Sequence, residues 1–176
     1  MAATSPEVSL LSEPSFSKSW EVLVQLDDID WLIMQELQVN GRISFKDLGD
    51  LVGLSAPAAA ERIRRLERRG VITGFRAVLD PDVLGIPILA VIRVNARADA
   101  VKRIDEIAPE IPEVIECHRV TGSDSHVIRA RLRSTAHLEE LLERLLPYGD
   151  TITNIVTSSP VYRRPLSRQV LEPDRQ

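Results

Sequence analysis

The chain has 176 residues, of which 44% are hydrophobic and 27% charged, and its formal net charge is −4. This composition is typical of a soluble protein with one domain or two small ones, and it excludes a fibrous or wholly disordered chain. No apolar run is long enough to span a bilayer, and the N-terminus lacks the pattern of a secretory signal. Because the single Cys117 cannot form an intrachain disulfide, we expect a cytoplasmic protein.

Residues 1–25 are rich in Ser and Pro and show no sustained periodicity, so we expect a flexible N-terminal tail. A first helix is predicted from Asp27 or Asp28 to about Val39, where Asn40 and Gly41 follow. A second helix is predicted to begin after Ser44.

The stretch from Asp47 to Gly70 predicts two helices joined by a tight turn. Gly53 ends the first of them, and Ser55 is a strong N-cap for the next. Pro57 lies in the first turn of that helix, where its missing N–H costs little. From Glu61 onward this helix carries five arginines against two glutamates. A short helix, a glycine turn and a basic second helix are typical of the helix-turn-helix, whose second helix enters the major groove of DNA.

A structural alternative must be considered for the same arginines. Basic residues near a helix C-terminus interact favourably with the helix dipole, and Glu61 can pair with Arg65 one turn on. The charge distribution favours the DNA interpretation. Residues 1–60 have three basic and nine acidic side chains, whereas residues 61–97 have eight arginines and four acidic side chains.

Residues 71–79 are β-prone and end at the turn Asp80-Pro81, so we predict a wing or a linker strand there. Residues 26–80 thus form a predicted winged helix-turn-helix domain. Residues 81–163 alternate in the order βαββαβ, which predicts a ferredoxin-like domain and an α+β protein, with residues 164–176 as a C-terminal tail. The two helices would cover one face of the sheet, and we expect a second copy of the chain to cover the other, giving a homodimer.

No catalytic motif is present, and we expect neither an enzyme nor a bound cofactor. Cys117, His118, Asp124 and His126 lie around one hairpin and could in principle hold a metal, but their alternation along the strands favours packing roles, so no metal site is predicted. The turn from Thr121 through Gly122, Ser123 and Asp124 to Ser125 offers hydroxyl groups and a carboxylate suited to an α-ammonium group. The same sequence is also ordinary turn chemistry.

Residues 26–165 together resemble the Lrp/AsnC (feast/famine) family of bacterial and archaeal regulators. The first half carries the pattern of that family in Leu26-Asp27, Gly53-Leu54-Ser55, Arg65-Leu66-Glu67 and Gly70-Val71-Ile72. The second half resembles the family in VTGSDSHVIRARL and YGDTITNIVTSSPV.

The resemblance implies a homodimer, often stacked into an octamer, that binds double-stranded DNA and a small effector, typically an amino acid. It places Arg42, Ser44, Ser55 and Arg62 near DNA phosphates and Pro57, Ala58, Ala60 and Glu61 in the groove. Outer arginines such as Arg65 and Arg68 would contribute to sequence preference. Thr121, Gly122 and Asp124 would line the effector site with Thr151 and Thr153.

A rival hypothesis is an amino-acid-binding module that regulates an enzyme by protein contact and binds no DNA. The predicted helix-turn-helix argues against it, and a DNA-binding test at low salt separates the two.

Overall fold

The computed structural model describes residues 25–170, which divide into two compact units. One unit contains the chain up to Ala77 together with the chain from Arg163 onward, and the other extends from Val78 to Tyr162. The predicted N-terminal tail, residues 1–25, lies almost entirely outside the described residues. Among the described residues, no helix combines the length and the apolar character needed to cross a membrane.

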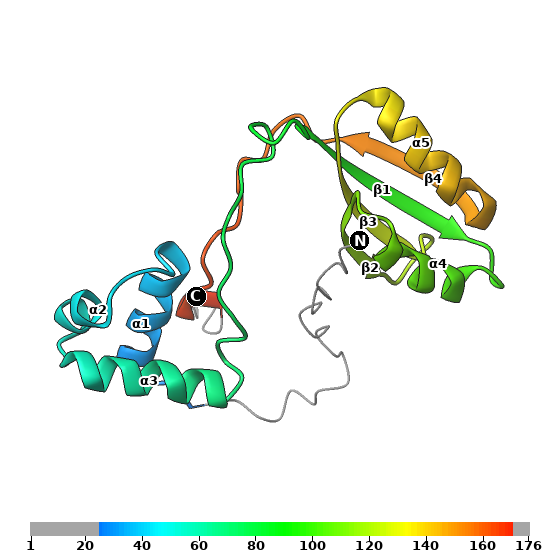
Figure 1. Cartoon of the computed structure of the whole chain (residues 1–176). Helices are drawn as coiled ribbons and strands as arrows, with labels where there is room; N and C mark the ends of the chain where they lie inside the picture. The colour runs from blue at the N-terminus through cyan, green and yellow to red at the C-terminus, as the bar shows by residue number, and fades with distance from the viewer. Residues whose placement is uncertain (1–24, 171–176) are drawn as a thin grey trace, which may run out of the picture. The chain divides into compact units, whose positions relative to one another are not determined.

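The first unit is built on three helices, α1 (Asp28–Val39), α2 (Phe45–Val52) and α3 (Ala56–Arg68) (Figure 1). Their N-caps are the predicted ones: the side chains of Asp27, Ser44 and Ser55 each accept a hydrogen bond from a backbone N–H in the following turn. The helices enclose a small apolar core, whose fully buried members are Ile33, Leu48, Ala59 and Leu66.

The joint between α2 and α3 confirms the predicted tight turn. Gly53 has a φ of 73°, the left-handed conformation that ends α2. A Cβ atom on Gly49 would lie 2.5 Å from the carbonyl oxygen of Leu54. A glycine inside α2 therefore lets the turn backbone approach the helix closely, and this approach fixes where α3 starts.

The predicted strand over residues 71–79 is wrong, because this segment forms no strand in the described chain. It runs without regular structure from α3 to the start of the second unit. A β-prone segment becomes a strand only when a neighbouring backbone accepts and donates its ladder hydrogen bonds, and none does so here.

The end of the described chain contacts the three-helix unit. The side-chain amide of Gln38 on α1 accepts a hydrogen bond from the Leu166 backbone N–H at 2.7 Å and donates to the Leu166 carbonyl at 3.0 Å. The guanidinium of Arg168 pairs with Asp28 at 2.6 Å. Leu166 and Arg168 therefore attach this part of the chain to α1.

The second unit has the predicted βαββαβ order. Its elements are β1 (Ile88–Ala96), α4 (Val101–Ile107), β2 (Val114–Arg119), β3 (His126–Leu132), α5 (Thr135–Leu145) and β4 (Gly149–Ile155). Three short 3-10 helices are η1 (Ala108–Glu110), η2 (Leu146–Tyr148) and η3 (Arg168–Val170), of which η3 belongs to the first unit. The strands form one antiparallel sheet in the order β2-β3-β1-β4 (Figure 1).

One face of this sheet packs on the two helices. The alternation predicted for β3 is observed, with Ile128, Ala130 and Leu132 fully buried beside residues of α4 and α5 such as Ile104 and Leu141. The opposite face mixes apolar and charged side chains, among them the exposed Ile152 of β4.

Candidate nucleic-acid interface and effector site

The outward face of α3 carries polar side chains at helical spacing. Pro57, Glu61, Arg64 and Arg68 are all exposed, on the side of the helix opposite the buried Ala59, Ile63 and Leu66. This is the face that a helix-turn-helix presents to the major groove.

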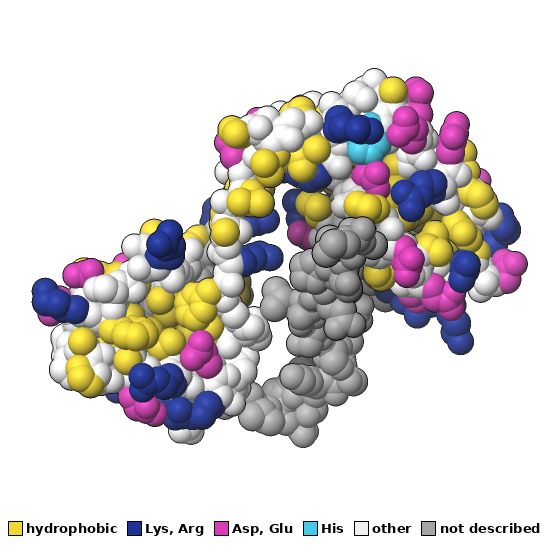
Figure 2. Space-filling view, viewed as in Figure 1, with side chains coloured by type: hydrophobic (Ala, Val, Ile, Leu, Met, Phe, Trp, Pro, Cys, Tyr) yellow, Lys and Arg dark blue, Asp and Glu magenta, His cyan; other side chains and the backbone are white. Residues whose placement is uncertain are grey.

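Glu61 lies at the centre of that face and binds two of its arginines. Its carboxylate accepts from Arg68 at 2.8 Å and from Arg64 at 3.3 Å. The Arg68 hydrogen bond, followed by the Arg64 one, lowers the pKa of Glu61 below its usual value. Figure 2 shows basic and acidic side chains intermingled along the edge of the unit where α3 runs. The positive charge that the sequence places on this helix is thus partly neutralised on its own surface.

One of the residues assigned to the groove lies elsewhere. Ala60 is 5% exposed and packs in the interior, so it cannot reach a base edge, and its place in the predicted set is corrected here. Ala58 is half-buried, and its backbone N–H donates to the Ser55 hydroxyl at 3.4 Å. Sequence periodicity could have identified Ala60 as inward, because it lies three residues before the buried Ile63.

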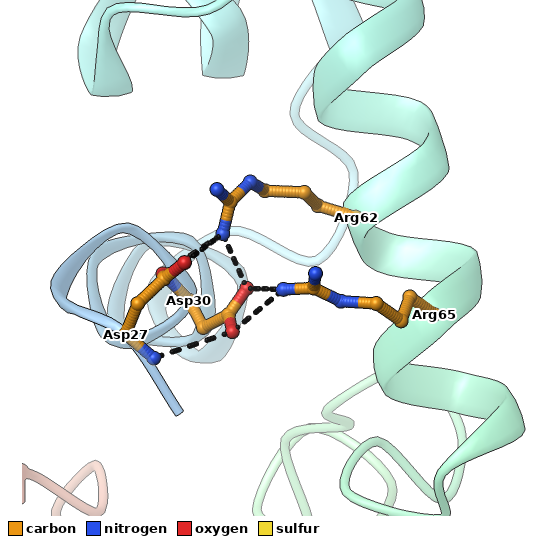
Figure 3. Close-up of polar contacts among 4 residues, drawn as sticks. All are labelled: Asp27, Asp30, Arg62 and Arg65. Carbon is orange, nitrogen blue, oxygen red and sulfur yellow. Dashed lines mark hydrogen bonds and ion pairs between the residues drawn. The ribbon is translucent and has the colours of Figure 1, made fainter. Parts of the chain in front are cut away.

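Arg62 and Arg65 are held by the start of α1 (Figure 3). Nη1 of Arg62 lies 2.6 Å from Asp27 Oδ2 and 2.9 Å from Asp30 Oδ1. Nη2 of Arg65 lies 2.8 Å from both carboxylate oxygens of Asp30. The Arg62 hydrogen bond, with a further bond from the Asp30 backbone N–H, lowers the pKa of Asp27. We call Asp27, Asp30, Arg62 and Arg65 the α1–α3 ion cluster.

The α1–α3 ion cluster is more buried than the ion pairs of Glu61 with Arg64 and Arg68. Asp30 is 1% exposed, and the side chain of Arg62 is only 23% exposed. Removing one partner from a buried ion pair costs about 3–5 kcal/mol, because the remaining charge stays where water cannot solvate it. Water can replace either partner of the exposed Glu61. The sequence pointed to Arg62 as a phosphate contact, whereas the structure commits its guanidinium to two carboxylates of α1.

Arg42 and Ser44 precede α2 and are exposed. The Ser44 hydroxyl accepts from the Asp47 backbone N–H at 3.1 Å and bonds the Asp47 carboxylate at 2.6 Å. The Arg42 backbone N–H donates to the Asn40 side chain. These residues present one arginine beside the N-terminus of a helix, an arrangement suited to a phosphate.

The overall charge of the three-helix segment is balanced. Residues 25–77 contain eight basic and eight acidic side chains, so no net field from this segment draws DNA from a distance. The surroundings of each arginine must therefore decide which of them can contact a phosphate. The attached residues 163–170 add three further arginines to the unit.

In the second unit, the predicted effector turn connects β2 and β3. Thr121, Gly122 and Ser123 are exposed, and Gly122 has a φ of 116°. The carboxylate of Asp124 lies 3.7 Å from Nε of Arg93 on β1. The pair presents one anionic and one cationic group side by side. Sequence reasoning missed Arg93, although its charge within an apolar strand was a signal.

Thr151 and Thr153 are not brought to that turn. They lie in register with Val94 and Ile92, which are fully buried against the helices, so the threonines share the helix-covered face of the sheet. Arg93, the partner of Asp124, follows Ile92 and therefore lies on the opposite face. Thr151 and Thr153 thus lie on the face of the sheet opposite to Arg93.

Ser125 has a structural role in addition to its place in the turn. Its hydroxyl donates to the Val94 carbonyl at 2.9 Å, accepts from the Ala96 backbone N–H at 3.1 Å, and lies 2.9 Å from Nδ1 of His126. The buried His126 in turn contacts Asp105 at 2.9 Å through Nε2. Cys117 and His118 lie in register with Ile128 and Val127 on opposite faces of β2, as their alternation predicted.

A cavity of about 570 Å³ lies elsewhere in the second unit. It is bounded by the chain entering β1, from Val78 to Asp82 with Pro87, and by the chain leaving β4, from Val156 to Ser159. Arg131 lines it and donates to the Pro87 carbonyl at 3.1 Å. It includes no residue of the 121–125 turn, so its size does not identify the effector site.

A tri-helical unit with an outward basic helix, joined to a βαββαβ unit, defines a DNA-binding regulator with a ligand-binding domain. The sequence matches the AsnC-type helix-turn-helix domain over residues 26–67 and the Lrp/AsnC ligand binding domain over residues 89–166. The chain belongs to the Lrp/AsnC family of transcription regulators.

Two similar proteins each align with most of this chain and with most of their own length. An uncharacterized HTH-type transcriptional regulator of Bacillus subtilis, YezC, is 39% identical over 76% of this chain and 95% of its own length. The leucine-responsive regulatory protein of Haemophilus influenzae is 38% identical over 74% of this chain and 83% of its own.

Two similar solved structures are described as methionine complexes. A Neisseria meningitidis transcriptional regulator solved with L-Met has a TM-score of 0.78 at 26% identity, covering 84% of this chain and 99% of that one. The feast or famine regulatory protein of M. tuberculosis complexed with L-methionine has a TM-score of 0.69 at 33% identity, covering 80% and 97%.

Proposed function

We propose that this protein regulates transcription by binding DNA through α3, and that an amino acid bound to its second unit changes its DNA occupancy. The observation that carries the proposal is the exposed polar face of α3, positioned by the close α2–α3 turn in a chain of this family. The amino-acid class is supported by the methionine complexes of two relatives. Because its partner is DNA, we also propose a cytoplasmic location.

For the DNA interface we propose a division of roles among exposed residues. Arg42, Ser44 and Ser55 lie at helix N-termini and contact phosphates, whose negative charge helix dipoles favour. Pro57, Glu61, Arg64 and Arg68 face the groove. Glu61 can accept from a cytosine amino group and Arg68 can donate to guanine, so this face suits G·C pairs.

For the effector site we propose that Arg93 and Asp124 bind the amino acid. An α-amino acid has a carboxylate and an ammonium group, which match a guanidinium and a carboxylate held 3.7 Å apart. Asp124 is 21% exposed, so it is reachable and partly shielded from solvent. Thr121, Gly122 and Ser123 supply hydroxyl and backbone groups around the pair.

We further propose a homodimer formed through the uncovered face of the sheet, with dimers stacked into an octamer. The exposed Ile152 lies in register with Arg93, and Val91 and Val127 are only half-covered on the same face. A second copy of this face would bury these side chains. A dimer would also carry two copies of α3, as pseudo-palindromic half-sites require.

The first experiment is a genome-fragment pull-down, with binding at about 50 mM salt and washing at about 200 mM. We expect a few fragments sharing a pseudo-palindrome to survive the wash. Uniform recovery that the wash removes would favour the rival function, regulation by protein contact without DNA.

The recovered fragments then allow the effector proposal to be tested. We expect Asp124→Ala to abolish the response of DNA binding to methionine and related amino acids while leaving binding without effector unchanged. Asp99→Ala is the control, because it removes an 83% exposed carboxylate of the same unit that pairs with Arg97 and lies outside the 121–125 turn. Amino-acid affinity that survives Asp124→Ala would refute the carboxylate role.

A further inference from the structure

The flank of α3 that faces α1 carries a neutral cluster at the point where the sequence suggests phosphate ligands. In the α1–α3 ion cluster, two aspartates balance two arginines (Figure 3). Asp30 also accepts from the backbone N–H of Asp27, and Asp27 accepts from that of Asp30. The capping box of α1 thus positions both carboxylates in addition to the two arginines.

The arginines of α3 that pair with α1 differ from those that pair with Glu61 in the effect on the carboxylate that they would leave. Asp30 is 1% exposed with the 41% exposed Arg65 in place. If Arg65 turned toward a phosphate, both oxygens of that carboxylate would lose a charged hydrogen bond, and only Arg62 and the Asp27 N–H would remain as partners. If Arg68 turned toward a phosphate, the exposed Glu61 would be solvated at once. Arg68 is therefore available to DNA, and Arg65 is not.

We propose that Asp30, assisted by Asp27, is a positioning residue for DNA recognition. It fixes Arg62 and Arg65 to α1 and withholds them from the phosphate backbone. This has two consequences. First, α3 is held in one orientation. Second, binding that depends only on phosphate charge stays weak, so the outward face of α3 decides between DNA sequences. The inference rests on the proposed DNA-binding function, because it concerns which arginines carry that function.

The test is the salt dependence of binding to a random-sequence DNA duplex, measured with the full chain. The slope of log affinity against log salt changes by about 0.9 for each phosphate neutralised, which is about 3.5-fold in affinity between 50 and 200 mM salt. A residue that only supports the fold does not change this slope. Thermal unfolding of each variant shows that the slopes refer to folded protein.

We expect Arg65→Met and Arg62→Met to leave the slope at its wild-type value, since methionine keeps the apolar stem and removes only a charge already neutralised. Arg68→Met is the matched control: on a random duplex, where no guanine is positioned for it, Arg68 is open to phosphate, and its loss should lower the slope by about 0.9. Asp30→Asn should steepen it by about the same amount, because Arg65 loses its carboxylate while Arg62 keeps Asp27. The double variant Asp30→Asn with Arg65→Met should return to the wild-type slope.

A drop in slope for Arg65→Met or Arg62→Met equal to that of Arg68→Met would overturn the proposal, since those arginines would then be phosphate ligands. An unchanged slope for folded Asp30→Asn would overturn it as well. If Asp30→Asn does not fold, the three arginine variants decide the question by themselves. Wild-type protein that binds neither the random duplex nor genomic fragments would instead refute the DNA-binding function.

Discussion

The substitution Gly49→Ala tests whether close contact between α2 and the following turn positions the recognition helix. A Cβ atom at this site would lie 2.5 Å from the Leu54 carbonyl oxygen and 3.3 Å from the carbonyl carbon of Ser55. The turn cannot easily retreat, because the Leu54 backbone N–H donates to the Gly49 carbonyl at 2.8 Å. Ser55 is also the N-cap of α3, so any retreat moves that helix.

A gain in helix propensity and two steric and hydrogen-bond costs together decide whether Gly49→Ala raises or lowers the free energy of unfolding. Alanine is favoured over glycine inside a helix by about 1 kcal/mol. Overpacking against backbone costs about 1–3 kcal/mol, and weakening the Leu54–Gly49 hydrogen bond costs about 1 kcal/mol more. We therefore expect the free energy of unfolding of the helical unit to fall by about 1–3 kcal/mol, and DNA binding to weaken because α3 shifts.

Thermal unfolding followed by far-UV circular dichroism measures this change. For a unit of this size, each kcal/mol shifts the midpoint by about 4–8 °C. Gly41→Ala is the matched control. Its Cβ would meet Phe75 and Leu37 at 3.5 and 3.6 Å, ordinary contact distances, so it should be neutral or stabilising by about 0.4–1 kcal/mol. If Gly49→Ala raises the midpoint as Gly41→Ala does, the turn yields freely and the contact does not position α3.

Two further predictions concern stability away from the interface. A hydrogen bond from His137 lowers the pKa of Glu113 below 4.5, so its stabilising contribution is present above that pH and is lost as the pH falls further. Glu113→Gln should therefore lower the unfolding midpoint at neutral pH, with a difference from wild type that shrinks toward pH 3 or so; a constant difference would contradict the pairing. Gln38→Met removes both hydrogen bonds to Leu166, so hydrogen exchange of the Leu166 amide should accelerate at least several-fold, whereas Gln35→Met on the same helix should leave it unchanged.

Much of the fold could be predicted because it depends on neighbours along the chain. The helix starts at Asp27, Ser44 and Ser55 follow from side chains that reach backbone N–H groups two or three residues on. The glycine turn before Ser55 and the alternation of β3 are equally local signals.

The candidate sites depend on contacts between residues distant in the chain, and the sequence did not predict these contacts. The basic face of α3 seemed available to DNA, but Arg62 and Arg65 find carboxylates 32 and 35 residues away, in a different helix. Thr153 and Asp124 belong to strands and turns whose faces are set only when the register of the sheet is known.

The sequence by itself thus determined where helices begin, which residues alternate in the strands, and the family to which the chain belongs. Only the tertiary structure decided that residues 71–79 lack a strand partner, that Leu166 and Arg168 attach to α1, and which arginines of α3 pair with carboxylates of another helix. The physical reason is the distance along the chain over which each interaction acts. Caps and periodicity are fixed within one or two turns of chain, whereas the partner of a charge or a strand edge exists only after distant elements have packed together.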